Sequence, residues 1–468
     1  MEYLGDELTY VLVMDDRHQD PMVAQPDPGR RDELVNTARP LRNLAVDFYR
    51  VTGVVLIVLG HWLAGSVTYR DGYFGRQNPL VDQPWTQWLT WPFQAVPTFF
   101  LVAGYAGAVS WTHRRHTAGA SRQVWLRHRL ARVLGPTMVY VTLVSVVVVV
   151  LDACQVAGST LEYAGWAVAM HLWFLAVYLI VVSLTPVAIA AQRRWGLLVP
   201  ALLGLGVPAV DAISLAGHPP CLGWLNYLLC WGSLYQLGIA WQKGLLAGRR
   251  PVLLATGSAV ALALLILLGP YPVSMIGVPG QTVQNTDPPS VAMLAFAGAQ
   301  AGVLMALAPA LNRALRSGFV ARVLSVANSN VMALYLWHMI PVVVVAIVGY
   351  PAGLLPQPAE GTASWWLARL EWIVILTLLT AVEMVLLWWG RRLFAAPLPT
   401  LATQLAGRWA DPVMLAGAVM AAYGLALLAA EGFAPDGRFP WPTALIFAVG
   451  VLLVALRPAV PRGQRTPR

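Results

Sequence analysis

The sequence has few charged residues and few cysteines, and both scarcities limit what the protein can be. Charged residues make up only 11% of the 468 residues, whereas 58% are hydrophobic. A soluble globular domain has about 25% charged residues, so the composition excludes an ordinary soluble protein. The three cysteines, Cys154, Cys221 and Cys230, lack metal-ligand spacing. We expect Cys154 and Cys221 on the same side of a membrane, as a disulfide or as two free thiols.

The N-terminal segment lacks the pattern of a secretory signal. Residues 1–41 are polar and rich in Asp, Pro and Arg, without a basic stretch followed by an apolar one. We therefore expect a disordered cytoplasmic tail at 1–41. The net charge of +9 would suit a nucleic-acid-binding protein. The arginines, however, gather in short segments between apolar runs, which is typical of cytoplasmic membrane loops and argues against a nucleic-acid partner.

Long apolar runs recur along the whole chain. Runs of at least about 17 residues can cross a lipid bilayer as helices, so the sequence predicts an all-α, polytopic transmembrane bundle. We expect about 12 spans, near 44–64, 93–112, 133–151, 167–190, 196–215, 224–241, 251–270, 291–311, 328–349, 365–389, 412–430 and 441–456.

Basic residues orient these spans. With the N-terminus inside, all but four of the 31 basic residues lie in cytoplasmic segments or at cytoplasmic helix ends. The exceptions are Arg70, Arg76, Arg369 and Arg438. The sequence thus predicts a multi-pass protein of the inner (cell) membrane with both termini in the cytoplasm. The outer connection 271–290 is rich in Pro, Gly and amides, and we expect it either to contact a substrate or to be a plain connector.

Three polar residues stand out in the first span. Asp47, Arg50 and His61 are costly near a bilayer centre, so residues like these persist where they have partners or a function. Arg50 and His61 are eleven residues apart, about 16 Å along a helix, and Asp47 shares their stripe. Each residue alone also fits a structural role, such as pairing between Asp47 and Arg50. Together they predict a site that begins at the cytoplasmic end of the helix and continues to His61.

Five segments, in sequence order, resemble the motifs of the acyltransferase 3 family of integral-membrane O-acyltransferases. The first is the spacing of Arg50 and His61, with ten residues between them. The resemblance extends over roughly Leu41 to Arg392. The other four segments are VPTFFLVAGYAGA (96–108), RLARVLGP (129–136), HLWFLAVYL (171–179) and ALYLWHMIP (333–341).

The resemblance divides the chain into a core and an extension. The family core commonly has ten helices, so we expect a tail at 1–41, an acyltransferase-like core at 42–392, an appended transmembrane hairpin at 393–456 and a cytoplasmic tail at 457–468. The chain departs from the family at Ala103–Gly104, where many members have Ser-Gly. It also has Pro136 one residue later than the family pattern.

The resemblance implies that the protein transfers an acyl group from acyl-CoA to a hydroxyl group. The expected donor is acetyl-CoA, and no metal is expected. Acyl-CoA carries several phosphates, which arginine side chains bind well. Arg129 and Arg132 lie one turn apart near the start of the third span, where free N–H groups also favour anions. With Arg50 and Asp47 they form the predicted donor site at the cytoplasmic face.

Histidines are the candidates for the chemistry, because imidazole takes up and returns protons near neutral pH. His61 is the predicted base, and in an alternative it accepts the acyl group and relays it outward. His171 and His338 are candidates for the acceptor side, or they bond neighbouring helix carbonyls. Glu371 and Glu383 are expected to face the bundle interior, either in structural pairing or, for Glu371 in particular, near the acceptor.

The implied acceptors are hydroxyl-bearing carbohydrates, glycolipids and glycosylated metabolites. Abundant Ala, Val, Leu and Arg with few Lys suggests a bacterium of high GC content. The alternative function is a proton-coupled transporter or exporter, because intramembrane His, Asp and Glu also form proton relays. No repeat with matched broken helices is visible, which disfavours a transporter. The acyltransferase hypothesis predicts Arg50, Arg129 and Arg132 around one inner opening, with His61 deeper in the same cavity.

Overall fold

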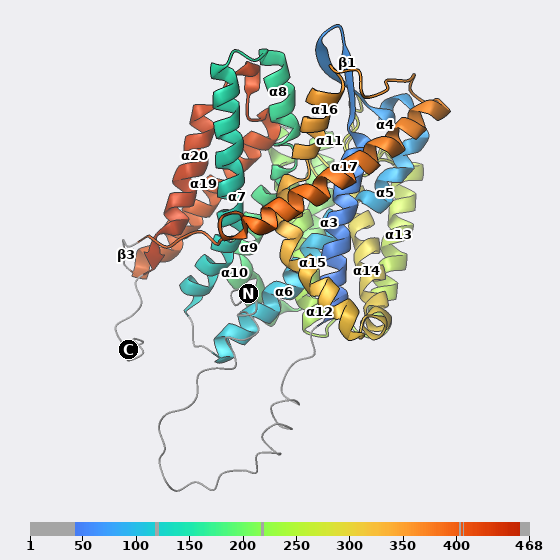
Figure 1. Ribbon diagram of the computed structural model, residues 1–468. Helices are drawn as coiled ribbons and strands as arrows, with labels where there is room; N and C mark the ends of the chain where they lie inside the picture. The colour runs from blue at the N-terminus through green and yellow to red at the C-terminus, as the bar shows by residue number, and fades with distance from the viewer. Residues whose placement is uncertain (1–42, 118–120, 217–219, 402–403, 406, 459–468) are drawn as a thin grey trace, which may run out of the picture. The chain divides into compact units, whose positions relative to one another are not determined.

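The computed structural model describes residues 43–117, 121–216, 220–401, 404–405 and 407–458. The predicted tail at 1–41 and residues 459–468 of the predicted tail 457–468 lie outside these ranges. Within them, the unit that begins at Leu44 is almost entirely helical (Figure 1). This confirms the predicted all-α bundle.

The longer helices build the bundle, and short helices and strands lie between them. The longer ones are α3 (Leu44–Ala64), α6 (Val96–Thr117), α7 (Arg122–Ala153), α8 (Gly158–Ala167), α9 (Leu172–Ser183), α10 (Thr185–Trp195), α11 (Leu198–Leu215), α12 (Leu225–Gln242), α13 (Arg250–Leu268), α14 (Val291–Ala314), α15 (Gly318–Trp337), α16 (Ile340–Gly349), α17 (Ala363–Trp389), α19 (Gly407–Glu431) and α20 (Trp441–Ala455). The short helices are α4 (Pro79–Asp82), α5 (Thr90–Phe93), α18 (Arg391–Phe394), η1 (Pro84–Leu89), η2 (Pro220–Leu222) and η3 (Pro435–Gly437). The strands are β1 (Ser66–Arg70), β2 (Tyr73–Gln77), β3 (Gln404–Leu405) and β4 (Arg457–Pro458).

Fewer helices than predicted are both long enough and apolar enough to cross a membrane. Within the described ranges, nine are long and apolar enough, or ten if α8 and α9 count as one bent span. The prediction of twelve also included α12 and α20 as separate spans, and it joined α16 to α15 in the span 328–349. The helices α16 and α20 have only 10 and 15 residues, and α12 carries several polar residues, three of them buried: Asn226, Ser233 and Gln236.

Two predicted continuous spans are broken in the structure. The predicted span 328–349 is divided between α15 and α16 at His338 and Met339. Pro341 explains this break, because its ring would clash with the carbonyl of Trp337 and it has no N–H to donate. The predicted span 167–190 begins at a second break, where α8 and α9 meet at an angle of 41°. No proline marks this bend, so nothing in the local sequence indicated it.

The C-terminal hairpin of α19 and α20 packs against the core. Helix α19 lies along α9, and α20 contacts α7. The segment between α19 and α20 is bonded to α8, because Phe433 N donates to Gly165 O at 3.2 Å. Ahead of the hairpin, Leu398 N donates to Ala131 O at 2.8 Å, so the chain after α18 returns along α7. The hairpin thus braces the helices on both sides of the α8–α9 break.

Helices α6 and α12 approach each other closely at two glycines. A Cβ atom built on Gly104 would lie 2.0 Å from Tyr235 O, and one built on Gly238 would lie 2.0 Å from Leu101 O. Real side chains never come this close to a carbonyl, so the two backbones can touch only where the Cβ is missing. Helix α6 also packs beside α3, where Gly53 of α3 lies against Phe99 of α6.

We expect the substitution Gly104→Ala to destabilise the protein. The new methyl group must force α6 and α12 apart, which costs on the order of 1–3 kcal/mol. The thermal unfolding midpoint of the detergent-solubilised protein should fall by several degrees. The control is Gly257→Ala in α13, where an added Cβ meets no atom within 4 Å. Equal midpoints for the two variants would contradict this account of the α6–α12 contact.

Candidate active site

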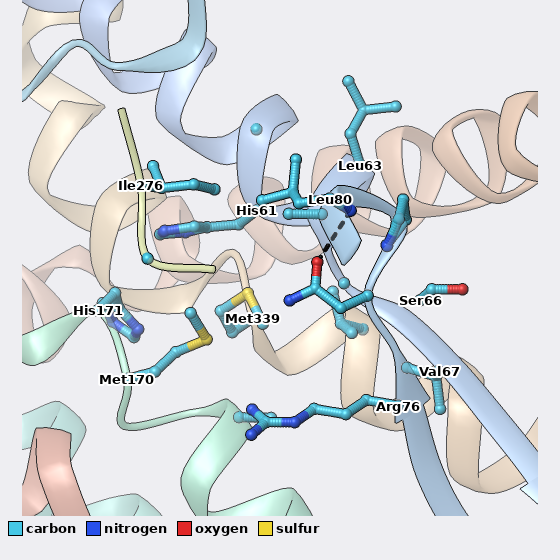
Figure 2. A pocket seen from close by; sticks show the side chains of 18 of the residues that line it. His61, Leu63, Ser66, Val67, Arg76, Leu80, Met170, His171, Ile276 and Met339 are labelled. Carbon is cyan, nitrogen blue, oxygen red and sulfur yellow. Dashed lines mark hydrogen bonds between the residues drawn. The ribbon is translucent and has the colours of Figure 1, made fainter. Parts of the chain in front are cut away.

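A cavity of about 430 Å³ lies at the end of α3 that carries His61 (Figure 2). Its walls come from α3, the β1–β2 hairpin, the α4–α5 segment, the α8–α9 break, α16 and α17. The connection 271–290 also contributes, through Ile276, Gly277, Pro279 and Thr286. This volume is in the range of small-molecule sites.

Hydrogen bonds hold the connection 271–290 over the cavity. Gln94 Nε2 donates to Met275 O at 2.6 Å, and Met275 N donates to Thr90 Oγ1 at 2.9 Å. At the far end of the connection, Val291 N donates to the buried Asp211 carboxylate at 2.7 Å. Of the two sequence interpretations, the structure favours a segment that can contact a substrate.

His61 and His338 meet edge to edge across the bundle. His61 Nδ1 and His338 Nε2 are 2.8 Å apart, and the ring planes differ by only 13°. A second contact supports the pair, because Trp62 Nε1 donates to His338 O at 3.1 Å. That carbonyl is available because the break after α15 leaves it outside the regular helical ladder.

The partners of His338 determine which nitrogen of His61 is free. His338 Nδ1 lies 2.8 Å from Tyr335 O, and a carbonyl only accepts, so Nδ1 carries the hydrogen. In the neutral ring, His338 Nε2 is then an acceptor, and His61 Nδ1 donates to it. The lone pair of His61 is left on Nε2. His61 lines the cavity, so this arrangement is that of a base ready to take a proton.

His171 completes a cluster of three histidines. Its ring centroid is 5.0 Å from that of His338, and the ring packs edge-on against Tyr140 and Tyr335. The Tyr335 hydroxyl donates to the His171 carbonyl at the α8–α9 break. His171 is 1% exposed and lines the cavity. Its ring lies near the Leu336 carbonyl, but neither ring nitrogen completes a hydrogen bond of normal geometry with a described residue.

Arg369 of α17 holds the end of α3. Its Nη2 donates to the carbonyls of Trp62, Leu63 and Gly65, at 3.0, 3.3 and 2.7 Å. These carbonyls belong to the C-terminal end of the helix, where a cation also complements the helix dipole. Figure 1 shows α17 running obliquely across α3 and α15, with which it is in contact. These hydrogen bonds begin at the residue after His61, so Arg369 helps to fix the position of the His61 ring along the helix axis.

Asp47 and Arg50 lie at the other end of α3. Arg50 Nη1 donates to Asn328 Oδ1 of α15 at 3.0 Å and lies 3.9 Å from Asp47 Oδ1. Asp47 is buried. The two residues therefore form an ion pair against α15, and neither of them lines the cavity around His61.

Arg129 and Arg132 are the eighth and eleventh residues of α7, at the same end of the bundle as Arg50. The helix starts earlier than predicted, so the free N–H groups expected beside these arginines lie at Arg122 and the residues next to it instead. A hydrogen bond shows where α7 begins: Trp125 Nε1 donates to Ser110 Oγ near the C-terminal end of α6. Helix α6 runs antiparallel to α3, so its C-terminal end lies beside the N-terminal end of α3, where Arg50 is. Arg129 stacks at 5.9 Å over Trp125, and Arg132 is exposed. Neither arginine lines the cavity around His61.

The structure also differs from two further sequence expectations, one about the residues that share the cavity with His61 and one about Glu371. Arg50, Arg129 and Arg132 were predicted to share one cavity with His61, but the cavity that His61 lines extends away from them, toward the β1–β2 hairpin. Glu371 was predicted to face the bundle interior, but it is exposed and lines a separate cavity of about 80 Å³. One oxygen of Glu383 is buried, as expected. Glu371 differs from the prediction because α17 crosses the bundle obliquely and turns this side chain outward.

The sequence analysis missed Arg369 and Tyr335 as site residues. Arg369 was assigned to an outer helix end, although a single arginine near an apolar span is itself a signal of a buried partner. Tyr335 gave no signal, because its hydroxyl contacts a carbonyl 164 residues away in the chain.

A comparison with known protein families identifies the group to which the chain belongs. The family model of the acyltransferase 3 group, described as an acyltransferase domain, matches residues 43–389. The match includes all the helices that line the cavity and ends before the α19–α20 hairpin. No curated protein and no solved structure matches the chain. The chain is therefore a multi-pass membrane protein that belongs to the acyltransferase 3 family.

Proposed function

We propose that the protein transfers an acyl group from acyl-CoA to a hydroxyl group of a carbohydrate, glycolipid or glycosylated metabolite. The observation that carries this proposal is the hydrogen bond between His61 Nδ1 and His338 Nε2, which leaves His61 Nε2 as a base in a cavity of about 430 Å³. We take acetyl-CoA as the donor and the inner membrane as the location.

The proposed reaction uses His61 as a general base. His61 Nε2 removes the proton of the acceptor hydroxyl while the hydroxyl oxygen attacks the thioester carbonyl. The C–S bond then breaks, and the thiolate of CoA receives the proton from His61. The positive charge on His61 is shared through its hydrogen bond to His338, whose own N–H points at Tyr335 O. His171 lines the same cavity and is placed to donate to an oxygen of either substrate.

An acyl-histidine relay would use the same nitrogen. His61 Nε2 would attack the thioester and release CoA, and the acceptor hydroxyl would then take the acyl group from the imidazole. Mass spectrometry of the protein after incubation with acyl-CoA alone separates the two routes. An acyl adduct on His61 indicates the relay, and its absence during turnover indicates direct transfer.

The donor site in this proposal lies at the opposite end of α3. Arg50, Arg129 and Arg132 gather cationic charge there, with Asp47 beside Arg50. An extended pantetheine arm can cover much of the roughly 16 Å between Arg50 and His61. The phosphates would stay at the cytoplasmic face while the thioester approaches the histidines. The acceptor would enter from the opposite side, through the cavity.

The alternative of a proton-coupled exporter has less support. Broken helices with titratable residues occur in transporters, and α8–α9 and α15–α16 are of this kind. However, His61 bonds His338, the ring of His171 packs against His338 in the same cluster, and the family is one of acyltransferases.

The substitution His61→Ala should abolish acyl transfer and leave membrane insertion intact. Removal of a general base lowers the rate by about 100- to 10,000-fold. The measurement is the release of CoA by purified protein supplied with acetyl-CoA and a hydroxyl acceptor from the producing cell's surface glycans and lipids. The control is His113→Ala, at an exposed histidine far along α6. Substantial transfer by a folded His61→Ala protein would refute the role of His61.

The substitution His338→Leu should lower kcat with little change in KM for either substrate. Without the acceptor at Nε2, His61 can carry its hydrogen on the wrong nitrogen, and we expect a loss of at least about tenfold. The variant His338→Gln offers an amide oxygen near the former Nε2 position and should recover part of the rate. Equal activities of the Leu and Gln variants would show that His338 only fills space.

The variants Arg129→Ala and Arg132→Ala should raise the KM for acyl-CoA more than the KM for the acceptor. Each lost charge-assisted hydrogen bond to a phosphate costs about 1.5–3 kcal/mol, or roughly tenfold or more in binding. Initial rates with each substrate varied separately provide the test. Arg194→Ala, in the last turn of α10, is the control. Equal effects on the two KM values would argue against a donor site at these arginines.

A further inference from the structure

The cavity around His61 has positive charge and no negative charge in its wall. Its lining residues include Arg76 and Arg369 but no Asp or Glu from the described part of the chain. The rest of the lining is mainly apolar, with side chains such as Leu63, Val67, Phe74, Leu80, Val343 and Trp365. Arg369 is buried, and a buried guanidinium among apolar side chains is an unfavourable arrangement unless an anion approaches it. Arg76 is exposed and adds a second positive charge to the wall of the same cavity.

Arg369 has hydrogen-bonding capacity left over. Its side chain is only 6% exposed, and Nη2 is engaged with the end of α3. Its Nε is buried without a hydrogen-bond partner among the described residues. Glu360 acts on Arg369 electrostatically, but it makes no ion pair with it and does not line this cavity. A buried donor of this kind is a group that a ligand is expected to satisfy.

Arg76 approaches the cavity from the β1–β2 hairpin. Its guanidinium lies 4.5 Å over the ring of Trp166, and Figure 2 shows the side chain directed into the cavity below Met170 and His171. Arg76 and Arg369 both act electrostatically on Tyr163, which also lines the cavity. The two arginines therefore come from separate elements, β2 and α17, and converge on one region.

We propose that the acceptor is an anionic amphiphile, with a phosphate or carboxylate bound by Arg76 and Arg369 and its apolar part along the cavity wall. This deepens the proposed function and takes from it only the placement of the acceptor hydroxyl at His61. The Arg-bearing region and His61 line the same cavity, so one molecule can contact both. A neutral polysaccharide fits less well, because it has neither an anionic group for the two arginines nor an apolar part for the mainly apolar wall.

Binding of small probes tests this inference without acyl transfer. The full-length protein is placed in nanodiscs of zwitterionic lipid, and equilibrium dialysis measures the binding of hexyl phosphate, hexanoate and hexanol, with empty nanodiscs subtracted. One of the two anions should bind at least about tenfold more tightly than hexanol. Tighter hexyl phosphate identifies a phosphate-bearing acceptor, and tighter hexanoate identifies a carboxylate-bearing one.

Arginine variants connect the binding to this site. Arg76→Gln should weaken anion binding by about tenfold and leave hexanol unchanged, whereas Arg76→Lys should lose less because it keeps the charge. Arg70→Gln is the matched control, since Arg70 is an exposed arginine of the same hairpin that does not line this cavity. Equal affinities for anions and hexanol, or unchanged anion binding in Arg76→Gln, would overturn the inference. Failure of acyl transfer with intact anion binding would instead contradict the proposed function alone.

Discussion

The hydrogen bond between His61 Nδ1 and His338 Nε2 is the interaction on which the site depends. It joins α3 to the break between α15 and α16. In a continuous helix the His338 carbonyl would be bonded within the helix, but here it accepts from Trp62. Pro341, which ends α15, therefore contributes to the contact between the two helices: it frees the His338 carbonyl that accepts from Trp62, the neighbour of His61.

The second break serves the same cluster. The bend between α8 and α9 places His171 at the start of α9, with its carbonyl bonded to Tyr335 and its ring against His338. Interrupted helices are tolerated inside a membrane only where protein or a cavity satisfies the freed backbone groups. Here both breaks face the cavity around His61. The α19–α20 hairpin, outside the matched family region, packs along α9 and braces this bend.

Arginine side chains gather in two separate places, one at each end of α3. The arginines of α3 and α7 gather at the Arg50 end, whereas Arg76 and Arg369 lie around the cavity at the His61 end. Arg369 also has a structural role, because it donates hydrogen bonds to the carbonyls at the C-terminal end of α3. A membrane protein that brings two substrates to one histidine from opposite ends requires a separate place for the charge of each. The separation is consistent with an acyl donor at one end and an anionic acceptor at the other.

The sequence by itself determined the helical membrane architecture and the family, because hydropathy, arginine placement and motif order are local properties of the chain. It also selected the histidines as candidates, and their role stays a prediction. It placed Asp47, Arg50 and His61 on one stripe of one helix, since helical periodicity alone decides that. Only the tertiary structure decided that His61 bonds His338, that Arg369 clamps α3 and that Glu371 is exposed. These depend on the packing of α3 against the α15–α16 break at His338 and on the oblique path of α17, and both arise from contacts between segments hundreds of residues apart. The cavity opens away from Arg50 for the same reason: its wall comes from many separate segments whose arrangement no single segment encodes.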